Sequence, residues 1–480
     1  MSLPKVPQSR AEINLAWMQE ALKQAPFQIL DMAWANGSVG DGIGVMSSLE
    51  RVTLTILPDD GGEAKKISVI VKTPPSGNPD LRKFVLSEGF CQREYKMYTK
   101  MFPAWAKYQD ERNTPEKFRF RHPHCYYAAE EGVSPTEYKM VLVLEDMVAS
   151  GYSGWGQGYR GKGLRWTQAK QVVKEMALFH AVGMAYKEEI GLKHYSGPEY
   201  DWLYTHFKDQ SLLDTYLRSG IDSTTQFLTS LPPSKSIPPQ LISDLSSFTD
   251  IHRLEELSFP RGSRAGTITH CDMHTHNVLF SAQNSVALLD FQGCSYSSPM
   301  TDLTFFLLLC CDSAIFTSPS RLHEVWTVYG DTFAAAARAM DSSVKYPLHE
   351  IVEDYHASLV NSVMHIVLGS KQWCFSEKLT SPETQDRYEA ALIDSFTRCG
   401  GTFSLALVEQ WADYFEREES EEEQVSDFFS DDDNYYYDTD KMIALSSSPP
   451  RERKRMMTAT DKMVVLSGSP LQEKRWVRAA

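Results

Sequence analysis

The pattern of apolar and polar positions predicts several β-strands in the N-terminal part of the chain. Residues 49–56 alternate between apolar and polar side chains, and residues 27–34 and 67–72 are further short runs rich in apolar residues. Alternation with a period of two indicates a strand with one buried face, because successive side chains of a strand point to opposite faces of a sheet. Residues 138–146 are apolar almost to their end, which predicts a fully buried strand.

Beyond the last of these strands, apolar residues recur mainly at helical spacing. The most regular segment is 167–186, in which Val172, Met176 and Phe179 lie on one broad face together with His180. We interpret His180 as a core histidine of this helix rather than as a ligand. Further helices are predicted at residues 10–23, 86–102, 303–311, 322–340, 349–368 and 385–414, the last one broken near Cys399.

Length and composition are those of a globular protein with room for two lobes. The chain has 480 residues, of which 42% are hydrophobic and 11% aromatic. No apolar run approaches the roughly 20 residues that a membrane helix requires, and the first residues lack the apolar segment of a secretory signal. The eight cysteines include no Cys-x-x-Cys pair, so we expect reduced thiols. These observations predict a cytoplasmic protein without a membrane span.

The formal net charge of −15 is distributed unevenly along the chain. Residues 416–440 hold twelve acidic side chains and one arginine, whereas residues 441–480 hold nine basic and three acidic side chains. The remainder of the chain is acidic, which argues against nucleic acid as a partner. High charge with few core residues predicts that residues 416–480 are a disordered tail. Its near repeat, 439–455 and 460–476, fits an inert extension, with docking of a protein partner as the alternative.

The most specific chemical pattern lies in residues 267–302. The letters HCD end at Asp272, Asn277 follows after four further residues, and a short apolar run ends in Asp290. Phosphoryl transfer needs a carboxylate that orients the acceptor hydroxyl, and oxygen ligands that hold Mg²⁺ against the phosphates. In this pattern Asp272 would accept or orient the hydroxyl proton, while Asn277 and Asp290 would hold the metal. Asp302 is expected to begin a helix and to cap it or brace this loop.

Two other interpretations of the same stretch stay open at this point. The first is a zinc site, since three histidines and a cysteine lie within residues 270–276, although no second cluster at finger-like spacing completes a tetrahedron. The second makes the Asp and the Asn ordinary turn residues between two buried strands. The features upstream of this stretch favour phosphoryl transfer over both.

Lys72 is the most informative residue of the predicted strands. Apolar residues surround it, and a lysine in such a place needs an anionic partner or a route to water. Kinases place a lysine here to bind ATP phosphates and to pair with a helix glutamate; the following predicted helix offers Glu94. The alternative is a lysine that reaches solvent at the strand end, with Glu94 on a solvated helix face.

A glycine-rich segment, residues 36–44, lies between the first two predicted strands. Its backbone N–H groups, near Gly40, Gly42 and Gly44, are suited to fold over phosphates. The spacing does not spell G-x-G-x-x-G, so a plain hairpin turn is an equal alternative.

Together these motifs resemble the ecdysteroid-kinase-like (CHK kinase-like) family, related to the choline kinases and aminoglycoside phosphotransferases. The resemblance covers about residues 27–399 and rests on GDGIGVMSSLERVTL, SVIVK, REYKMY, LVLEDM, the segment GYSGWGQGYRGKGLRWTQAKQVVKEMALFHA, HCDMHTHNVLF, LLDFQ and PMTDL. It implies an α+β, two-lobed protein-kinase-like fold, with an antiparallel β-sheet N-lobe over a mainly helical C-lobe. The lobes would then comprise residues 1–147 and 148–415, with ATP and Mg²⁺ between them.

By position, the resemblance assigns a role to each candidate residue. Lys72 and Glu94 become the phosphate-anchoring ion pair, and Asp272 becomes the base. The backbone of Glu145 to Met147 becomes the hinge that meets the adenine edge, although the Glu-Asp pair there also fits an ordinary polar strand end. The roles of Asn277 and Asp290 as Mg²⁺ ligands follow from the same positions.

The sequence departs from the family pattern at two positions next to the expected base. Cys271 replaces the usual glycine of H-G-D, and His274 replaces a common bulky residue. Neither change removes a phosphoryl-transfer group.

The expected activity is transfer of the γ-phosphoryl group of ATP to a hydroxyl of a small molecule, such as a steroid-like, choline-like or xenobiotic alcohol. Only eleven residues separate Asp290 from Asp302, which leaves little room for the activation loop that orders a peptide in protein kinases. The alternatives are an atypical protein kinase and a nucleotide-binding regulatory or scaffold protein with weak turnover.

Overall fold

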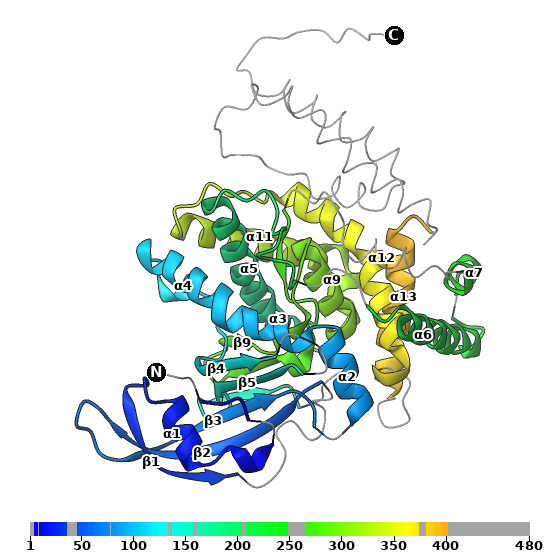
Figure 1. Cartoon of the computed structure of the whole chain (residues 1–480). Coiled ribbons are helices and arrows are strands. Elements are labelled where there is room, and N and C mark those ends of the chain that lie inside the picture. The colour runs from blue at the N-terminus through cyan, green and yellow to red at the C-terminus, as the bar shows by residue number, and fades with distance from the viewer. Residues whose placement is uncertain are drawn as a thin grey trace, which may run out of the picture.

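The computed structural model describes residues 4–7, 9–35, 46–76, 78–132, 134, 137–156, 161–203, 208–235, 237–247, 265–373 and 381–401. These residues form a two-lobed α+β structure, with an antiparallel sheet in the N-terminal lobe and mainly helices in the C-terminal lobe (Figure 1). The fold class predicted from the sequence is therefore confirmed.

The N-terminal lobe contains one five-stranded sheet in the order β1-β2-β3-β5-β4, with every neighbouring pair antiparallel. The predicted alternation is visible in β2, where Val52, Leu54 and Ile56 are buried in the core. The sequence analysis did not predict β4. The strands are β1 (Phe27–Trp34), β2 (Ser48–Pro58), β3 (Lys65–Thr73), β4 (Cys125–Glu131) and β5 (Lys139–Glu145).

The short helix α1 (Leu15–Ala21) covers the face of this sheet that points away from the C-terminal lobe (Figure 1). Met18 and Leu22 pack there against Val52 and Val69. The side chain of Asn14 accepts a hydrogen bond from the Trp17 N–H, which caps the helix start. The predicted helix 10–23 is thus divided into η1 (Arg10–Glu12), a 3₁₀ turn, and α1.

The single helix predicted at residues 86–102 is a series of helices instead. Gly89 adopts φ = 74°, a left-handed backbone that ends one helix and precedes the next. Helix α4 packs against the C-terminal lobe, with Trp105 edge-on to Phe179. The pieces are α2 (Pro79–Ser87), α3 (Phe90–Lys96), the π-helical turn η2 (Met97–Met101), α4 (Phe102–Glu111) and η3 (Glu116–Phe118).

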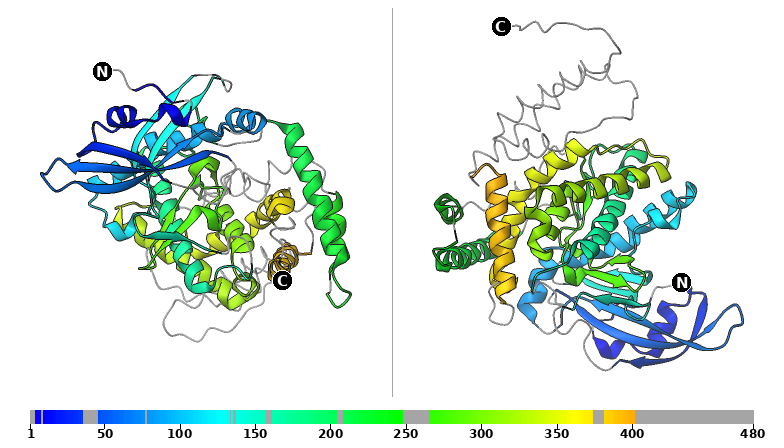
Figure 2. Two further views of the ribbon diagram at one scale, coloured as in Figure 1. Left: turned by 90° about the horizontal axis from the view of Figure 1, so that it is seen from below. Right: turned by 180° about the vertical axis from the view of Figure 1, so that it is seen from behind.

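The C-terminal lobe is organised around α5 and α9. His180 of α5 is buried, as the sequence predicts, and every residue of α9 is buried. Figures 1 and 2 show α6 at the edge of this lobe, beside α12. The helices are α5 (Trp166–Glu189), α6 (Gln210–Ser230), α7 (Pro239–Ser247), α9 (Pro299–Cys310), α10 (Ser313–Thr317), α11 (Pro319–Ala339), α12 (Leu348–Trp373) and α13 (Pro382–Arg398).

Residues 267–302 form short strands and turns of the C-terminal lobe and the start of α9. The strands pair antiparallel in the orders β6-β8-β9 and β10-β7. The chain passes between the lobes through residues 146–151, and we propose this segment as their boundary, close to residue 147. The elements are β6 (Tyr152–Gly154), β7 (Thr267–Thr269), η4 (Thr275–Asn277), β8 (Val278–Ser281), β9 (Val286–Leu288), η5 (Phe291–Gly293) and β10 (Ser295–Ser297).

Four further predictions concern a membrane span, the state of the cysteines, the tail and the cellular location. Across those ranges, no helix combines the length and apolar character needed to cross a bilayer. The cysteines that the structure describes are all free thiols. The predicted tail, residues 416–480, lies outside the described residues, so its disorder and its protein partner stay predictions, as does the cytoplasmic location.

Candidate active site

The structure brings Lys72, Glu94 and Asp290 together between the lobes. Lys72 Nζ lies 2.8 Å from Glu94 Oε1, 2.6 Å from Glu94 Oε2 and 2.7 Å from Asp290 Oδ1. Lys72 extends from β3, Glu94 from α3, and Asp290 from the turn after β9. The lysine therefore pairs with the helix glutamate and does not reach solvent, and it also connects the N-terminal lobe to the C-terminal lobe.

Burial and mutual charge set the proton affinities of this trio. Burial alone would lower the pKa of Lys72, but Asp290 and Glu94 outweigh it and raise that pKa above its usual value. Burial raises the pKa of Glu94 to about 7, although Lys72 acts in the opposite direction. Lys72 therefore stays positively charged through the neutral range, as a group that binds phosphate must.

Asp272 and Asn277 lie next to each other at the end of the loop that follows β7. Asn277 Nδ2 donates to the main-chain oxygen of Asp272 at 2.9 Å and to its Oδ2 at 3.1 Å. The Leu289 N–H in turn donates to the Asn277 carbonyl at 2.9 Å, which places Asn277 beside the residue that precedes Asp290. We call Lys72, Glu94, Asp272, Asn277 and Asp290 the inter-lobe site.

Two histidines contact Asp272. The Asp272 N–H donates to His270 Nδ1 at 3.3 Å while His270 Nε2 donates to the Leu289 carbonyl at 2.8 Å, so His270 holds the loop against the end of β9. His274 Nε2 lies 3.2 Å from Asp272 Oδ1. Burial would raise the pKa of Asp272, but His274, and after it His270, hold that pKa below its usual value. Asp272 is therefore a carboxylate at neutral pH and available as a hydrogen-bond acceptor.

Asp302 braces this loop, as its position in the sequence predicts. It lies in the first turn of α9 and is 1% exposed. Its Oδ2 accepts from the His270 N–H at 2.7 Å and its Oδ1 from the Cys271 N–H at 2.8 Å. His180 Nε2 also donates to Oδ2, at 3.0 Å. These three bonds satisfy a buried charge that would otherwise be costly.

Two residues, one in this loop and one in the turn after β9, adopt the left-handed backbone. Cys271 has φ = 59° and Asp290 has φ = 66°. Non-glycine residues seldom adopt this conformation, and it concentrates at functional positions where surrounding contacts hold it. The family pattern has glycine at the position of Cys271, so the cysteine occupies a backbone position that suits glycine.

The carboxylates of the predicted hinge, Glu145 and Asp146, bind side chains of the N-terminal lobe and of the connecting segment. Glu145 accepts from Arg121 Nη2 at 3.0 and 3.1 Å and from the Ser150 hydroxyl at 2.7 Å. Asp146 accepts from Arg51 Nε at 2.7 Å and from the Ser68 hydroxyl at 2.7 Å. The Glu145 side chain is therefore occupied within the protein, and its N–H donates to the His124 carbonyl at 2.8 Å.

Met147 offers an apolar surface and a main-chain donor. It is 3% exposed, and its carbonyl accepts from the Tyr152 N–H at 3.0 Å. No acceptor for the Met147 N–H lies among the described residues. Met147 packs with Leu279 and Ala287 below the hinge. The apolar surface beside this main-chain donor suits the face of a flat heterocycle.

The donor set suits Mg²⁺ better than zinc. Asp290 Oδ2 has one long contact, 3.4 Å to Gln292 Nε2, and Asn277 Oδ1 accepts no hydrogen bond from the described part of the chain. A carboxylate oxygen and an amide oxygen are hard ligands that leave several positions to phosphate and water. Within the described ranges, no group of three or more His, Cys, Asp or Glu side chains is arranged to hold a metal ion, which disfavours the zinc interpretation.

Three candidate glycines lie outside the described residues, and the sequence analysis missed two charged residues near the site. Gly40, Gly42 and Gly44 lie outside the described residues. The sequence analysis missed Arg93 and Glu88, two buried charged residues beside Glu94. The hydrogen bonds described for them join main-chain atoms, which leave no pattern in the sequence. The sequence signal for them was weak: each is a charged residue among apolar positions of a predicted helix.

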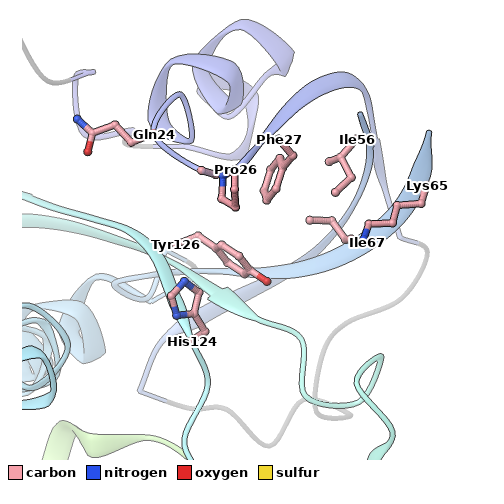
Figure 3. Close-up of a pocket in the computed structure, with 9 residues that line it drawn as sticks. Gln24, Pro26, Phe27, Ile56, Lys65, Ile67, His124 and Tyr126 are labelled. Carbon is pink, nitrogen blue, oxygen red and sulfur yellow. The ribbon is translucent and has the colours of Figure 1, made fainter. Parts of the chain in front are cut away.

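A cavity of about 500 Å³ lies elsewhere, on the N-terminal lobe (Figure 3). Phe27, Ile56, Ile67 and Tyr126 form its walls, with Lys65 at the rim. None of its lining residues belongs to the inter-lobe site, so this cavity is not the predicted nucleotide site.

Comparison with known proteins defines the family. The model of the ecdysteroid kinase-like family matches residues 41–341, more than half of the chain. The chain therefore belongs to the ecdysteroid kinase-like family, a family of kinase-like phosphotransferases. The comparison with curated proteins gives no match.

Solved structures with weak overall similarity include small-molecule kinases. A putative aminoglycoside phosphotransferase from Ralstonia eutropha is 14% identical, with 83% of this chain and 97% of that chain covered and a TM-score of 0.36. An ethanolamine kinase from Plasmodium vivax is 11% identical, with 82% and 90% covered and a TM-score of 0.34. A spectinomycin phosphotransferase, solved with ADP and spectinomycin, is 12% identical, with 79% and 97% covered and a TM-score of 0.31.

Proposed function

We propose that this protein is an ATP- and Mg²⁺-dependent phosphotransferase that moves the γ-phosphoryl group to a hydroxyl of a small molecule. The observation that carries the proposal is the convergence of Lys72, Glu94 and Asp290 with Asp272 and Asn277 at one site between the lobes. This set of groups meets the needs of phosphoryl transfer, which depends on positioning and on charge stabilisation.

Each residue of the inter-lobe site has a proposed role. Lys72 binds phosphate oxygens, and Glu94 holds the Lys72 ammonium in place. Asn277 and Asp290 hold Mg²⁺ through their side-chain oxygens. When bound, ATP supplies the phosphoryl group and Mg²⁺ offsets the charge on the phosphates. Asp272 accepts or orients the proton of the acceptor hydroxyl.

The hinge is the proposed site for adenine. The Met147 N–H and the backbone of Glu145 lie at the edge where a base would bind, above the apolar side chains of Leu279 and Ala287. Gly40, Gly42 and Gly44 remain our proposal for the backbone that covers the phosphates.

A small acceptor is supported by the short path after Asp290. The chain there forms only η5 and β10 before α9 begins at Pro299. Because β10 pairs with β7 and both of its ends are buried, this segment offers no loop on which a peptide could be ordered. We therefore propose a steroid-like, choline-like or xenobiotic alcohol as the acceptor.

The first experiment is a thermal-shift titration with ATP in the presence and absence of Mg²⁺. A ligand that binds only the folded state raises stability by mass action. We expect a Mg²⁺-dependent shift in the wild type, a much smaller shift in Asp290→Asn, and an unchanged shift in the control Asp222→Asn, an exposed residue of α6. No shift with any nucleotide in the wild type would contradict the proposal.

The second experiment measures turnover with a panel of alcohols. We expect Asp272→Asn to lower kcat by about a hundredfold or more, because the variant loses the carboxylate that orients the acceptor proton, while ATP affinity changes little. Nucleotide binding without consumption on any alcohol would favour the regulatory or scaffold alternative. Phosphorylation of protein substrates instead would favour an atypical protein kinase.

A further inference from the structure

Two buried charged residues outside the inter-lobe site lie at the corner between α2 and α3. Glu88 is 1% exposed and Arg93 is 3% exposed. Burying a charge costs free energy unless hydrogen bonds compensate it. The atoms that compensate these two charges therefore show what the charges hold in place.

Arg93 joins α3 to the turn that follows Asp290. Its Nε donates to the Gln292 carbonyl at 2.7 Å, and its Nη1 donates to the Glu88 carbonyl at 2.8 Å. Gln292 belongs to η5, which starts directly after Asp290, and the Glu88 carbonyl is at the C-terminal end of α2. One guanidinium thus fixes two main-chain carbonyls that belong to different lobes.

Glu88 joins the same corner to the start of α6. Its Oε2 accepts from the Lys208 N–H at 2.8 Å and its Oε1 from the Asp209 N–H at 2.9 Å. Asp209 is the N-cap of α6, and its side chain accepts from the Leu212 N–H. Amides at a helix start lack partners within the helix, so the Glu88 carboxylate satisfies two groups of the C-terminal lobe.

Through these contacts, Arg93 and Glu88 connect α2, η5 and α6 to α3, the helix that carries Glu94. Arg93 precedes Glu94 in α3, so a contact that fixes Arg93 on η5 also fixes the distance from Glu94 to Asp290. Asp290 has a left-handed backbone, with φ = 66°, which surrounding contacts must maintain. Arg93 supplies such a contact two residues further on, at Gln292.

We propose that Arg93 and Glu88 are positioning residues for phosphoryl transfer: they hold α3 against η5 and α6 so that Lys72, Glu94 and Asp290 meet in the geometry that binds the metal–nucleotide complex. This inference rests on the proposed function. Neither residue touches the inter-lobe side chains Lys72 or Asp290 in the hydrogen bonds described, so both act through the backbone.

The test compares variants that remove these contacts with a matched control. Arg93→Met removes both donors, Arg93→Lys keeps the charge but cannot reproduce the two-pronged contact, and Glu88→Gln keeps the side-chain shape with one acceptor oxygen. The control is Arg119→Met, because Arg119 Nε also donates to a main-chain carbonyl, that of Thr114, at 3.0 Å, away from the inter-lobe site.

Two readouts separate positioning from simple stabilisation. Hydrogen exchange without nucleotide reports on the amides of η5 and of Lys208 and Asp209. Calorimetric titration with ATP and excess MgCl₂, at one temperature well below every unfolding midpoint, reports on nucleotide affinity. We expect faster exchange in η5 for both Arg93 variants, and about tenfold weaker ATP binding for Arg93→Met, because α3 and η5 are then no longer held together.

Glu88→Gln should weaken ATP binding by about threefold although this residue lies outside the nucleotide site, and Arg119→Met should change neither readout. Unchanged η5 exchange and unchanged ATP affinity in the Arg93 and Glu88 variants, with only lower unfolding temperatures, would overturn the inference. A wild type that binds no nucleotide would overturn the proposed function instead. In that case faster η5 exchange in Arg93→Met would still support the contact between α3 and η5. If Arg93→Met fails to fold, Arg93→Lys and Glu88→Gln decide the question.

Discussion

Cys271 illustrates how a single backbone conformation constrains the residue beside the proposed base. A left-handed conformation costs an L-residue about 1–2 kcal/mol relative to glycine, while glycine loses more backbone entropy on folding. The thiol itself contacts the Thr269 hydroxyl, with Sγ 3.2 Å from Oγ1. Backbone strain and side-chain contact can therefore be separated by two substitutions.

We expect Cys271→Gly to be more stable than Cys271→Ala by about 1 kcal/mol, because both variants lose the thiol but only alanine keeps the strained β-carbon. Urea denaturation of the two variants measures the difference. Equal stabilities would show that the left-handed conformation carries no strain here.

Asp146 predicts a dependence of stability on pH. Burial would raise its pKa, but Arg51 and Ser68 hold the pKa below its usual value of 3.8. A carboxyl group whose folded-state pKa is lowered adds stability above its unfolded-state pKa, and this stability is lost as the pH falls through the folded-state value.

We expect Asp146→Asn to lower the free energy of unfolding at pH 7 by about 2 kcal/mol, because Arg51 loses its charged partner. The difference from wild type should shrink as the pH falls below 3.8. Denaturation curves at several pH values measure it, with Asp222→Asn as the exposed control. A difference that stays constant down to low pH would contradict the argument.

At the residue scale, the sequence predicted the groups that share a motif and missed those that bind main-chain atoms. Asp272, Asn277 and Asp290 have fixed spacing, and Lys72 is conspicuous because it is a charge among apolar residues. Arg93 binds the main-chain carbonyls of Gln292 and Glu88. Every residue has such a carbonyl, so the sequence does not show which ones are bound. The role of Arg93 depends on how two lobes meet, which no local pattern contains.

At the scale of elements, the crossing of α6 and α12 depends on one glycine. A β-carbon added at Gly220 would lie 2.1 Å from the Val367 carbonyl oxygen, so the backbone of α12 would have to move. Gly330 in α11 is a matched helical glycine whose added β-carbon would meet only the tip of the Ile351 side chain, at 3.0 Å.

We expect Gly220→Ala to destabilise the protein by about 2 kcal/mol, since overpacking against backbone outweighs the helix propensity of alanine. Gly330→Ala should be neutral or stabilising by up to about 1 kcal/mol, because the isoleucine tip can move. Thermal unfolding of both variants measures the contrast. A Gly220→Ala variant as stable as wild type would show that α6 and α12 can move apart at this crossing without a cost in stability.

Elements were predicted from the sequence where periodicity was strong. The long helix α5 and the strands β1, β2, β3 and β5 were located, whereas β4 was missed because its residues, CYYAAEE, are only partly buried and show no clear alternation. The helix predicted at residues 86–102 ends at Gly89 and restarts, since a single left-handed residue divides an apolar pattern that otherwise continues.

At the scale of the whole molecule, Lys72 is one of the charges that link the lobes. It is the cation between two carboxylates, Glu94 from the N-terminal lobe and Asp290 from the C-terminal lobe. Removing one partner of a buried ion pair leaves the others uncompensated, which costs more than the pair contributes.

We expect Lys72→Met to destabilise the protein by about 3 kcal/mol at neutral pH and to abolish the stabilisation by ATP with Mg²⁺. The double variant Lys72→Met, Glu94→Gln should recover part of the stability, because it removes one of the two stranded charges, but none of the response to nucleotide. Denaturation with and without ATP measures both. A double variant less stable than the single one by the full cost of Glu94→Gln would show that the two residues do not interact.

The order of the strands also bears on how the chain acquires its structure during synthesis. Because β3 pairs with β5, the N-terminal sheet lacks an inner strand until residue 145 has been made. The ion pair between Lys72 and Asp290 cannot form until Asp290, 218 positions further along the chain, has been made. Contacts so distant in sequence form late and slowly. The nascent N-terminal lobe therefore holds Lys72 and Glu94 without Asp290 until the C-terminal lobe emerges, so this site is among the last parts of the molecule to become native.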